Sequence, residues 1–238
     1  MAFKKKFNSE AKYVGLRDPF LLEYTLGKKV LHVGCTDWPF SKVSLDNESL
    51  LHAKLSHSCK ELMGLDIDES GIDYLKQRIP GNYICGNLIN ENVRSMTLKH
   101  DFDIILIPDV IEHVPNQFDF LSGVYEMSLK SGAEIIFTTP NVYAIKSNLA
   151  SLVGLDFTHT DHRSVHNEST LTTSVIADFE SNVKNYSFSY ASRDITVRYG
   201  KALSLVSRLI DNLFCLKPHL ADTIIIRVMP VDLKKQTI

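Results

Sequence analysis

The sequence predicts an α/β fold: a doubly wound, mostly parallel sheet of about seven strands with helices on both faces. Three observations predict it. Short runs rich in β-branched and aliphatic residues alternate along the chain with stretches of helical periodicity. The run FDIILI at 102–107 is almost entirely apolar, as in a strand covered on both faces. Alternation of strands and helices is typical of a parallel sheet, where a helix connects successive strands.

The chain length and composition favour one soluble unit. With 238 residues, 44% of them hydrophobic, the chain can form one substantial core, so we expect a single domain over residues 1–238. We expect residues 1–26 to be a helical or tail segment, whose lysines at 4–6 are solvated. No apolar stretch approaches the roughly 20 residues that span a bilayer, and none follows those lysines as a signal peptide requires.

The four cysteines bear on location. They lack the paired spacing of a zinc site or a disulfide framework, and unpaired thiols suit a reducing compartment. We therefore expect a cytoplasmic protein.

The first part of the chain contains the more regular elements. Five strands are expected there, at residues 29–34, 61–66, 83–86, 102–107 and 133–139. Helices are expected between them, at residues 50–58, 69–78 and 118–129. Pro80-Gly81 stops the second helix, and Gly132 follows the third.

The later part is less regular. Asn167 is a plausible capping residue for a helix that runs to about residue 180, and alternating residues predict strands at 186–191 and 223–229. The stretch 204–216 has helical spacing, and a buried helix is the first interpretation. The alternatives for it are a lid or a peripheral contact with a membrane surface.

Polar residues follow the end of each of the five strands. An open parallel sheet binds ligands at the carboxyl ends of its strands, so these residues predict a binding site. The stretches concerned are Gly34-Cys35-Thr36-Asp37, Asp66-Ile67-Asp68, Gly86-Asn87-Leu88, the segment PDVIEH at 108–113, and TTPN at 138–141.

Four of these strand ends, with the strands that precede them, read VLHVGC, MGLDID, IPDVIEHV and GAEIIFTTPN. These motifs occur in the order and at the separations of a known family. Over most of residues 27–229 the chain resembles the class I S-adenosylmethionine-dependent methyltransferases. It is most similar to O-methyltransferases of the ubiquinone-biosynthesis type and to methyltransferases of bacterial surface-glycan pathways. The resemblance implies a Rossmann-like fold, a transferase activity and S-adenosylmethionine as cofactor.

The resemblance also implies cofactor-binding residues. Gly34 would let the backbone approach the methionine half of the cofactor, and Asp66 would accept hydrogen bonds from both ribose hydroxyls. Asn87 stands where the family usually has an aspartate that faces the adenine amino group. Asp68 competes with Asp66 or caps the helix that follows it. The implied cofactor set is Gly34, Cys35, Thr36, Asp66, Ile67, Asn87, Leu88 and Asp109, in which Ile67 and Leu88 either flank the adenine or belong to the core.

The first loop departs from the family pattern. The family usually has an acid in place of His32 and glycines in place of Thr36 and Trp38. The Cβ of Thr36 narrows the approach to a cofactor, and Trp38-Pro39 stiffens the loop. We expect His32 to be a core histidine rather than a catalytic group.

A hydroxyl acceptor must lose its proton during methyl transfer, which requires a base or a metal ion. The candidate catalytic residues are Glu112, His113 and His162. Asp109, Glu112 and His113 have the spacing i, i+3 and i+4, so on one helical turn they would share a face and converge. In some relatives a matching set holds a divalent ion, which here implies Asp109, Glu112, His113 and His162 as ligands for Mg²⁺ or Mn²⁺.

The alternative to a metal site is a structural bond between Glu112 and His113, with His113 acting alone as the base. Pro115 disfavours helix at the preceding residue, so the turn that carries Glu112 and His113 should be short. His159 and His166 are expected at the surface.

Two classes of function remain. The first is a methyltransferase that acts at oxygen on a small-molecule or glycan-type acceptor, whose site residues 142–166 and 197–220 would cover. The second is a catalytically silent binding or scaffold protein, which the departures at Thr36 and Trp38 favour. An RNA 2′-O-methyltransferase is a third option, and the net charge of −2 argues against a nucleic-acid partner. No feature of the sequence determines the oligomeric state.

Overall fold

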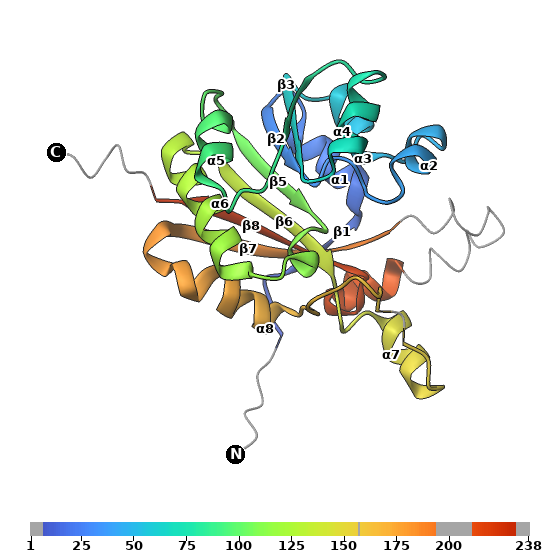
Figure 1. Ribbon diagram of the computed structural model, residues 1–238. Helices are drawn as coiled ribbons and strands as arrows, with labels where there is room; N and C mark the ends of the chain where they lie inside the picture. Colours follow the sequence, from blue (N-terminus) through green and yellow to red (C-terminus); the bar gives the residue numbers. More distant parts are fainter. Residues whose placement is uncertain (1–6, 157, 194–210, 232–238) are drawn as a thin grey trace.

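The computed structural model describes residues 7–156, 158–193 and 211–231, which form an α/β fold around one eight-stranded sheet (Figure 1). The strand order is β1-β7-β8-β6-β5-β2-β3-β4, and β8 alone runs antiparallel to its neighbours. The mostly parallel doubly wound sheet is therefore confirmed, with one strand more than expected. The strands are β1 (Lys12–Leu16), β2 (Lys29–Val33), β3 (Glu61–Asp66), β4 (Asn82–Cys85), β5 (Ile104–Pro108), β6 (Glu134–Pro140), β7 (Val183–Ser192) and β8 (Thr223–Pro230).

The additional strand is β1, in the segment that was expected to be helix or tail. β1 pairs in parallel with β7, and the Tyr13 hydroxyl lies 2.9 Å from the Ser192 hydroxyl on that strand. Because its partner lies about 175 residues further along the chain, local periodicity does not indicate this pairing. The first helix, α1 (Arg17–Thr25), follows β1 directly.

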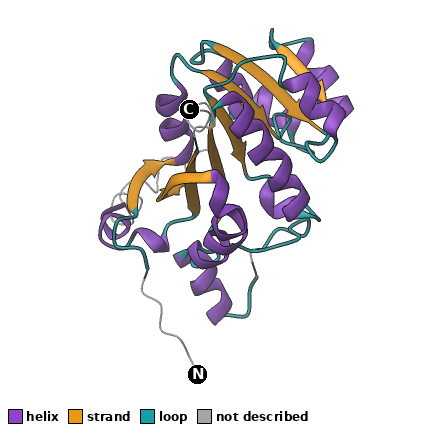
Figure 2. Cartoon of the chain, turned by 90° about the vertical axis from the view of Figure 1, so that its left-hand side faces the viewer, coloured by secondary structure: helices purple, strands orange, loops and turns teal. Residues whose placement is uncertain are grey.

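Helices cover both faces of the sheet (Figure 2). Alternate strand residues face opposite sides, so Val30 and Leu106 pack with α1 and α3, whereas Leu31 and Ile105 pack with α6. This double coverage explains why the strand segment FDIILI is apolar throughout. Besides α1, the helices are α2 (Ser41–Asp46), α3 (Leu51–Ser56), α4 (Glu69–Lys76), α5 (Glu91–Thr97), α6 (Gln117–Ser131), α7 (Ile145–Leu152) and α8 (Glu168–Leu171).

The ends of two helices agree with their sequence signals. Gly132 ends α6 in the left-handed region, with φ of 77°, and so satisfies the carbonyl of Ser128. Asn167 forms a capping box with Thr170 at the start of α8. The helix expected through residue 180 is instead broken into α8, a π-helical turn (Thr172–Ile176) and a 3₁₀ turn (Ala177–Asn182). Of the stretch 204–216, residues 204–210 lie outside the described chain and 211–216 are helical.

His32 is a core histidine, as expected, and it belongs to a buried chain of three side chains. The Nδ1 atoms of His32 and His52 lie 3.1 Å apart, and His52 Nε2 lies 3.2 Å from the Tyr83 hydroxyl. Tyr83 donates its proton to the carbonyl of Ile79, so His52 Nε2 donates to Tyr83 and His52 Nδ1 accepts from His32. Both rings are neutral in this arrangement. Burial lowers the pKa of His52 to about 4, and burial together with His52 and Arg17 lowers the pKa of His32.

This chain predicts that the protein loses stability in mild acid. A depressed histidine pKa contributes stability above the ordinary value of 6.5, and that contribution falls as the pH drops toward 4. For His52 the full loss is on the order of 3 kcal/mol, at about 1.4 kcal/mol per unit. Urea unfolding at about pH 7.5 and about pH 5 measures the difference. The free energy of unfolding should depend less on pH in His52→Gln than in the parent, whereas the exposed control His100→Gln should retain the parent's dependence. An equal pH dependence in all three proteins would contradict the role given to His52.

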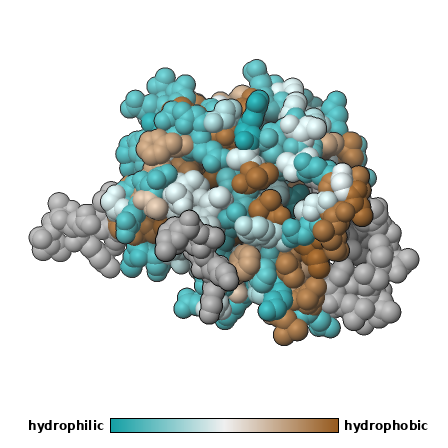
Figure 3. Space-filling model, turned by 90° about the horizontal axis from the view of Figure 1, so that it is seen from below, coloured by the Kyte–Doolittle hydropathy of each residue, from teal (hydrophilic) through white to brown (hydrophobic). Residues whose placement is uncertain are grey.

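Exposed apolar side chains gather around the end of α7, which projects from the body of the molecule (Figure 1). Leu149, Leu152, Val153 and Leu155 are all more than half exposed. The view from below shows apolar surface on this side (Figure 3). Across the part of the chain that the structure describes, every helix is too short or too polar to cross a bilayer.

Candidate functional site

The strand order of the sheet reverses between β2 and β5. From β2 the chain continues outward through β3 and β4, then returns to the other side of β2 as β5. In open α/β sheets, ligands bind in the crevice at such a switch point, outside the carboxyl ends of the strands. Gly34 follows β2 with φ of 78°, and a Cβ placed on it would lie 2.4 Å from Cγ2 of Val110 in the loop after β5. Only glycine allows this conformation and this contact together.

Asp66 ends β3 beside this crevice and is largely buried. Its Oδ2 accepts hydrogen bonds from the backbone N–H of Thr36 at 2.9 Å and from the Thr36 hydroxyl at 2.8 Å. Its Oδ1 accepts from the backbone N–H of Asp68 at 3.1 Å. Asp68 occupies the cap position of α4 without a side-chain capping bond. The β3 end therefore presents a carboxylate that still has accepting capacity on Oδ1.

The residues expected around the adenine differ in accessibility. Ile67 is 72% exposed, so it is available to a ligand and the core alternative for it is wrong. Leu88 is fully buried and packs in the core, so its side chain is not accessible. Asn87 uses its side-chain oxygen to accept the backbone N–H of Ile89 at 3.0 Å. Cys35 is also fully buried, and burial raises the pKa of its thiol far above the usual range.

Asp109 follows β5 with φ of 52° and is turned toward two arginines. It forms ion pairs with Arg17 and, at 2.7 Å, with Arg193, and it accepts the Thr138 hydroxyl at 3.1 Å. Burial tends to raise its pKa, but the two guanidinium groups outweigh this and lower it. Asp109 does not join Glu112 and His113 on one helical face, because its left-handed backbone precedes their turn. This corrects the expected convergence of the three residues.

Glu112 and His113 lie on a single 3₁₀ turn (Ile111–His113), and Val114 is extended before Pro115 as expected. His162 comes from the segment between α7 and α8. Among the described residues, one group of side chains is arranged so that it could hold a metal ion: the ligand atoms of Glu112, His113 and His162 lie within 4.8 Å of one another. The structure thus brings together three of the four expected ligands.

The Glu112 carboxyl has an unusual environment. Burial raises its pKa to about 8, and the nearby charge of Asp109 contributes. Its Oε2 accepts the Thr139 hydroxyl at 3.1 Å, whereas its Oε1 is buried and makes no hydrogen bond within the described structure. A buried carboxylate oxygen without a donor is costly, and a cation held with two imidazoles would satisfy it. The donor set therefore fits a divalent ion.

Backbone contacts attach the His162 segment to this turn. The carbonyl of Glu112 accepts the N–H groups of Arg163 at 2.7 Å and Ser164 at 3.2 Å. His159 is exposed as expected, but His166 is only 3% exposed, so its expected surface position is wrong. His166 is buried because residues 141–142 pair with it: Asn141 forms a β-bridge with it, and the Val142 N–H donates to its carbonyl.

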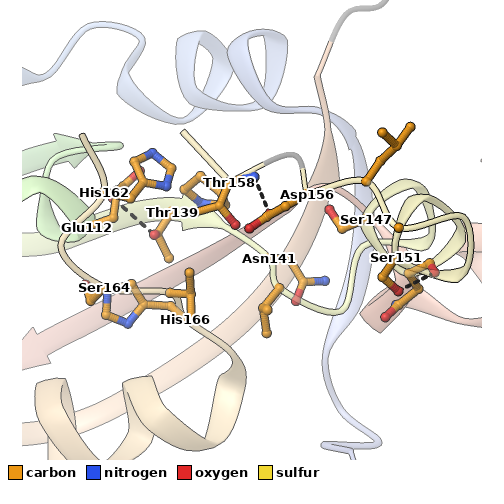
Figure 4. A pocket seen from close by; sticks show the side chains of 16 residues that line it. Glu112, Thr139, Asn141, Ser147, Ser151, Asp156, Thr158, His162, Ser164 and His166 are labelled. Atoms are coloured by element: carbon orange, nitrogen blue, oxygen red, sulfur yellow. Dashed lines mark hydrogen bonds between the residues drawn. The ribbon is translucent and has the colours of Figure 1, made fainter. Parts of the chain in front are cut away.

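A pocket of about 520 Å³ opens beside Glu112 and extends along the segment 139–166. In the close-up, Glu112, Thr139 and His162 lie at one end, and Ser147 and Ser151 at the other (Figure 4). Its lining is rich in hydroxyl and amide groups and, within the described chain, contains no lysine or arginine. Residues 142–166 supply most of the lining, as expected for an insertion over the site. The second expected insertion, 197–220, is described only from residue 211, and its described residues are not part of the lining.

Asn141 fixes one wall of this pocket, a role that its place in the TTPN motif did not reveal. Its side-chain amide donates to the carbonyls of His219 and Ala221, both at 2.8 Å, and its oxygen accepts the N–H of Tyr143 at 3.0 Å. The polar character of Asn141 at a strand end is the signal in the sequence. Its partners are distant in the chain and emerge only in the fold.

Comparisons with known proteins point to the methyltransferases. A family model described as a methyltransferase domain matches residues 47–137. A ubiquinone biosynthesis O-methyltransferase from Azoarcus sp. (strain BH72) is 26% identical over 133 residues, 55% of this chain and 52% of that protein. The chain thus matches about half the length of such curated relatives.

Two solved structures share the fold. Small RNA methyltransferase HEN1 has a TM-score of 0.57 at 17% identity, with 91% of this chain and 25% of that chain covered. A methyltransferase from Thermotoga maritima, described as a possible histamine N-methyltransferase, has a TM-score of 0.56 at 11% identity, with 89% and 86% covered. These likenesses show the fold. The methyltransferase-domain match and the curated relatives support a class I S-adenosylmethionine-dependent methyltransferase.

Proposed function

We propose that this protein is an S-adenosylmethionine-dependent O-methyltransferase that acts on a small-molecule or glycan-type acceptor. The observation that carries the proposal is the juxtaposition of two sites. Val110 contacts Gly34 at the crevice, and two residues later Glu112 begins the polar pocket. A methyl donor in the crevice and an acceptor in the pocket would therefore meet at the turn of Glu112 and His113.

The cofactor would be held by residues of the crevice. Gly34 leaves its backbone without a side chain of its own at the end of β2, where Val110 packs against it. Asp66 would offer an acceptor to the ribose, and Ile67 an exposed apolar surface to the adenine. S-adenosylmethionine supplies an activated methyl group, so the protein's contribution is to bind and orient the two reactants. Asp109 forms ion pairs with Arg17 and Arg193, so any effect of Asp109 on cofactor binding would be indirect, through these arginines.

Glu112, His113 and His162 would hold a divalent cation. One carboxylate oxygen and two imidazole nitrogens suit Mn²⁺ or another first-row transition ion better than Mg²⁺, which prefers oxygen ligands. Such an ion lowers the pKa of a bound hydroxyl. Without it, His113 would act as the base from the turn that it shares with the pocket residue Glu112. We do not include Asp109 among the ligands, because two arginines already neutralise it.

The pocket lining supports a hydroxyl-bearing acceptor. Serine, threonine and asparagine side chains pair well with hydroxyl groups, and the described lining offers no cation to phosphates. This favours a small molecule or glycan over RNA. The four cysteines are unpaired, which supports a cytoplasmic location.

Calorimetric titration with S-adenosylhomocysteine tests the proposal, and we expect micromolar binding. A screen of phenolic and sugar acceptors with S-adenosylmethionine should then show product, with and without Mn²⁺. Loss of product upon chelation, restored by Mn²⁺, would support the metal; product that is insensitive to chelation would leave His113 as the base. A folded protein that fails to bind S-adenosylhomocysteine at millimolar concentration would instead be a scaffold.

A further inference from the structure

Thr36 stands in the first loop of the crevice, where the family usually has a glycine. Its side chain is fully buried and does not point into the crevice. Space for it exists because residue 71 in α4 is glycine: a Cβ at Gly71 would lie 2.8 Å from the Thr36 Cβ. The threonine is therefore accommodated on the side of α4, away from the crevice, and does not narrow the approach to it.

In that position Thr36 contacts Asp66 twice. Its backbone N–H and its hydroxyl both donate to Oδ2, at 2.9 and 2.8 Å. A carboxylate oxygen has two lone pairs in the plane, so these two donors saturate Oδ2. Oδ1 accepts one N–H, from Asp68, and keeps one lone pair.

We propose that Thr36 is a positioning residue that locks the Asp66 carboxylate with Oδ1 as its one free acceptor, so that Asp66 binds a single ribose hydroxyl of the cofactor. This inference rests on the proposed function and goes beyond it. Where residue 36 is glycine, the carboxylate lacks the hydroxyl donor and has a further lone pair available. Here the Thr36 hydroxyl occupies a lone pair of Asp66 that a ligand could otherwise use. The same contact holds the carboxylate in place before the ligand binds, so less conformational entropy is lost when the ligand binds.

The test compares Thr36→Val, which removes the hydroxyl at nearly constant volume, with Thr36→Ser, which retains it. Calorimetry with S-adenosylhomocysteine should show about 10-fold weaker binding for Thr36→Val, because the Asp66 carboxylate would then have to be ordered when the ligand binds. Thr36→Ser should bind within about 2-fold of the parent, on the same scale. Melting curves of both variants verify that each is folded.

A double-mutant cycle with Asp66→Asn separates positioning from general structure. If Thr36 acts through Asp66, Thr36→Val should have little effect on affinity in the Asp66→Asn background. The 2′-deoxy and 3′-deoxy analogues of S-adenosylhomocysteine give the second readout. The analogue that lacks the hydroxyl bound by Asp66 should bind the parent more weakly than S-adenosylhomocysteine does, and Asp66→Asn should not weaken its binding further. The other analogue keeps that hydroxyl, so Asp66→Asn should still weaken its binding.

Three results would overturn the proposal: Thr36→Val that binds as tightly as the parent or tighter, an equal loss in the Asp66→Asn background, or equal Asp66-dependent losses with both deoxy analogues. Each of these leaves the proposed function intact, because the parent still binds. A parent that does not bind S-adenosylhomocysteine overturns the proposed function and this inference together.

Discussion

Replacing Asp66 with alanine should weaken binding of S-adenosylhomocysteine by about 100-fold. The carboxylate stands at the end of β3 beside the crevice, with Oδ1 able to accept a ribose hydroxyl. A hydrogen bond to a charged group contributes about 1.5–3 kcal/mol, and about 1.4 kcal/mol changes affinity tenfold. The substitution also frees the two Thr36 donors that Oδ2 now accepts, so the loop after β2 should become less ordered.

The matched control is Asp68→Ala, which removes an acid two residues away. The Asp68 side chain makes no capping bond to α4, and it accepts the Ser70 hydroxyl at 2.7 Å near the surface. Calorimetry should therefore find Asp68→Ala within about 3-fold of the parent, less than half of the free energy of one charged hydrogen bond. Equal losses in the two variants would show that negative charge near the crevice, rather than Asp66 itself, determines affinity.

Replacing His113 with alanine should reduce methyl transfer by roughly 100- to 1,000-fold, the range expected when a general base or a metal ligand is removed. His113 is the residue that both explanations of catalysis share: it is one of the three grouped ligands, and it lies on the turn next to the pocket. Binding of S-adenosylhomocysteine should be unchanged within about 3-fold, because His113 is not among the residues proposed to hold the cofactor. Initial rates under saturating cofactor measure the effect.

His159→Ala is the control for this experiment. Its ring centroid lies 6.3 Å from that of His113, yet it is exposed and is not one of the three grouped ligands. Manganese titration separates the two explanations: His113→Ala and His162→Ala should both lose the ion if a metal is used, whereas His159→Ala should retain it. A loss of activity in His159→Ala as large as that in His113→Ala would contradict the assignment.

Most strands and the order of the motifs were predictable from the sequence, because both are local properties. The run at β5 is apolar enough to indicate a strand covered on two faces, and Pro115 indicates the short turn that carries Glu112 and His113. The positions of Gly34 and Asp66 follow from those strand ends. Because the sheet was expected to be parallel, Gly34 and Asp66 were expected to lie at the same edge of it. The parallel pairing of β2 with β3 confirms this.

Other features depend on contacts between distant residues. Residue spacing suggested that Asp109, Glu112 and His113 would share one face, but Arg17 and Arg193 draw Asp109 elsewhere. His166 was expected at the surface, but its bridge with Asn141 buries it. In both cases the partners are distant in the sequence, so the residues around Asp109 and His166 do not indicate these contacts.

The sequence by itself determined the fold class, the strand ends and the residue types that chemistry requires there, because hydrophobic periodicity and turn residues act over short distances. The tertiary structure alone decided the pairing of β1 with β7, the separation of Asp109 from the Glu112 group, and the direction of the Thr36 side chain. The threonine illustrates the reason. Its effect on the crevice depends on whether Gly71 leaves space behind it, and a one-dimensional pattern does not contain that distance.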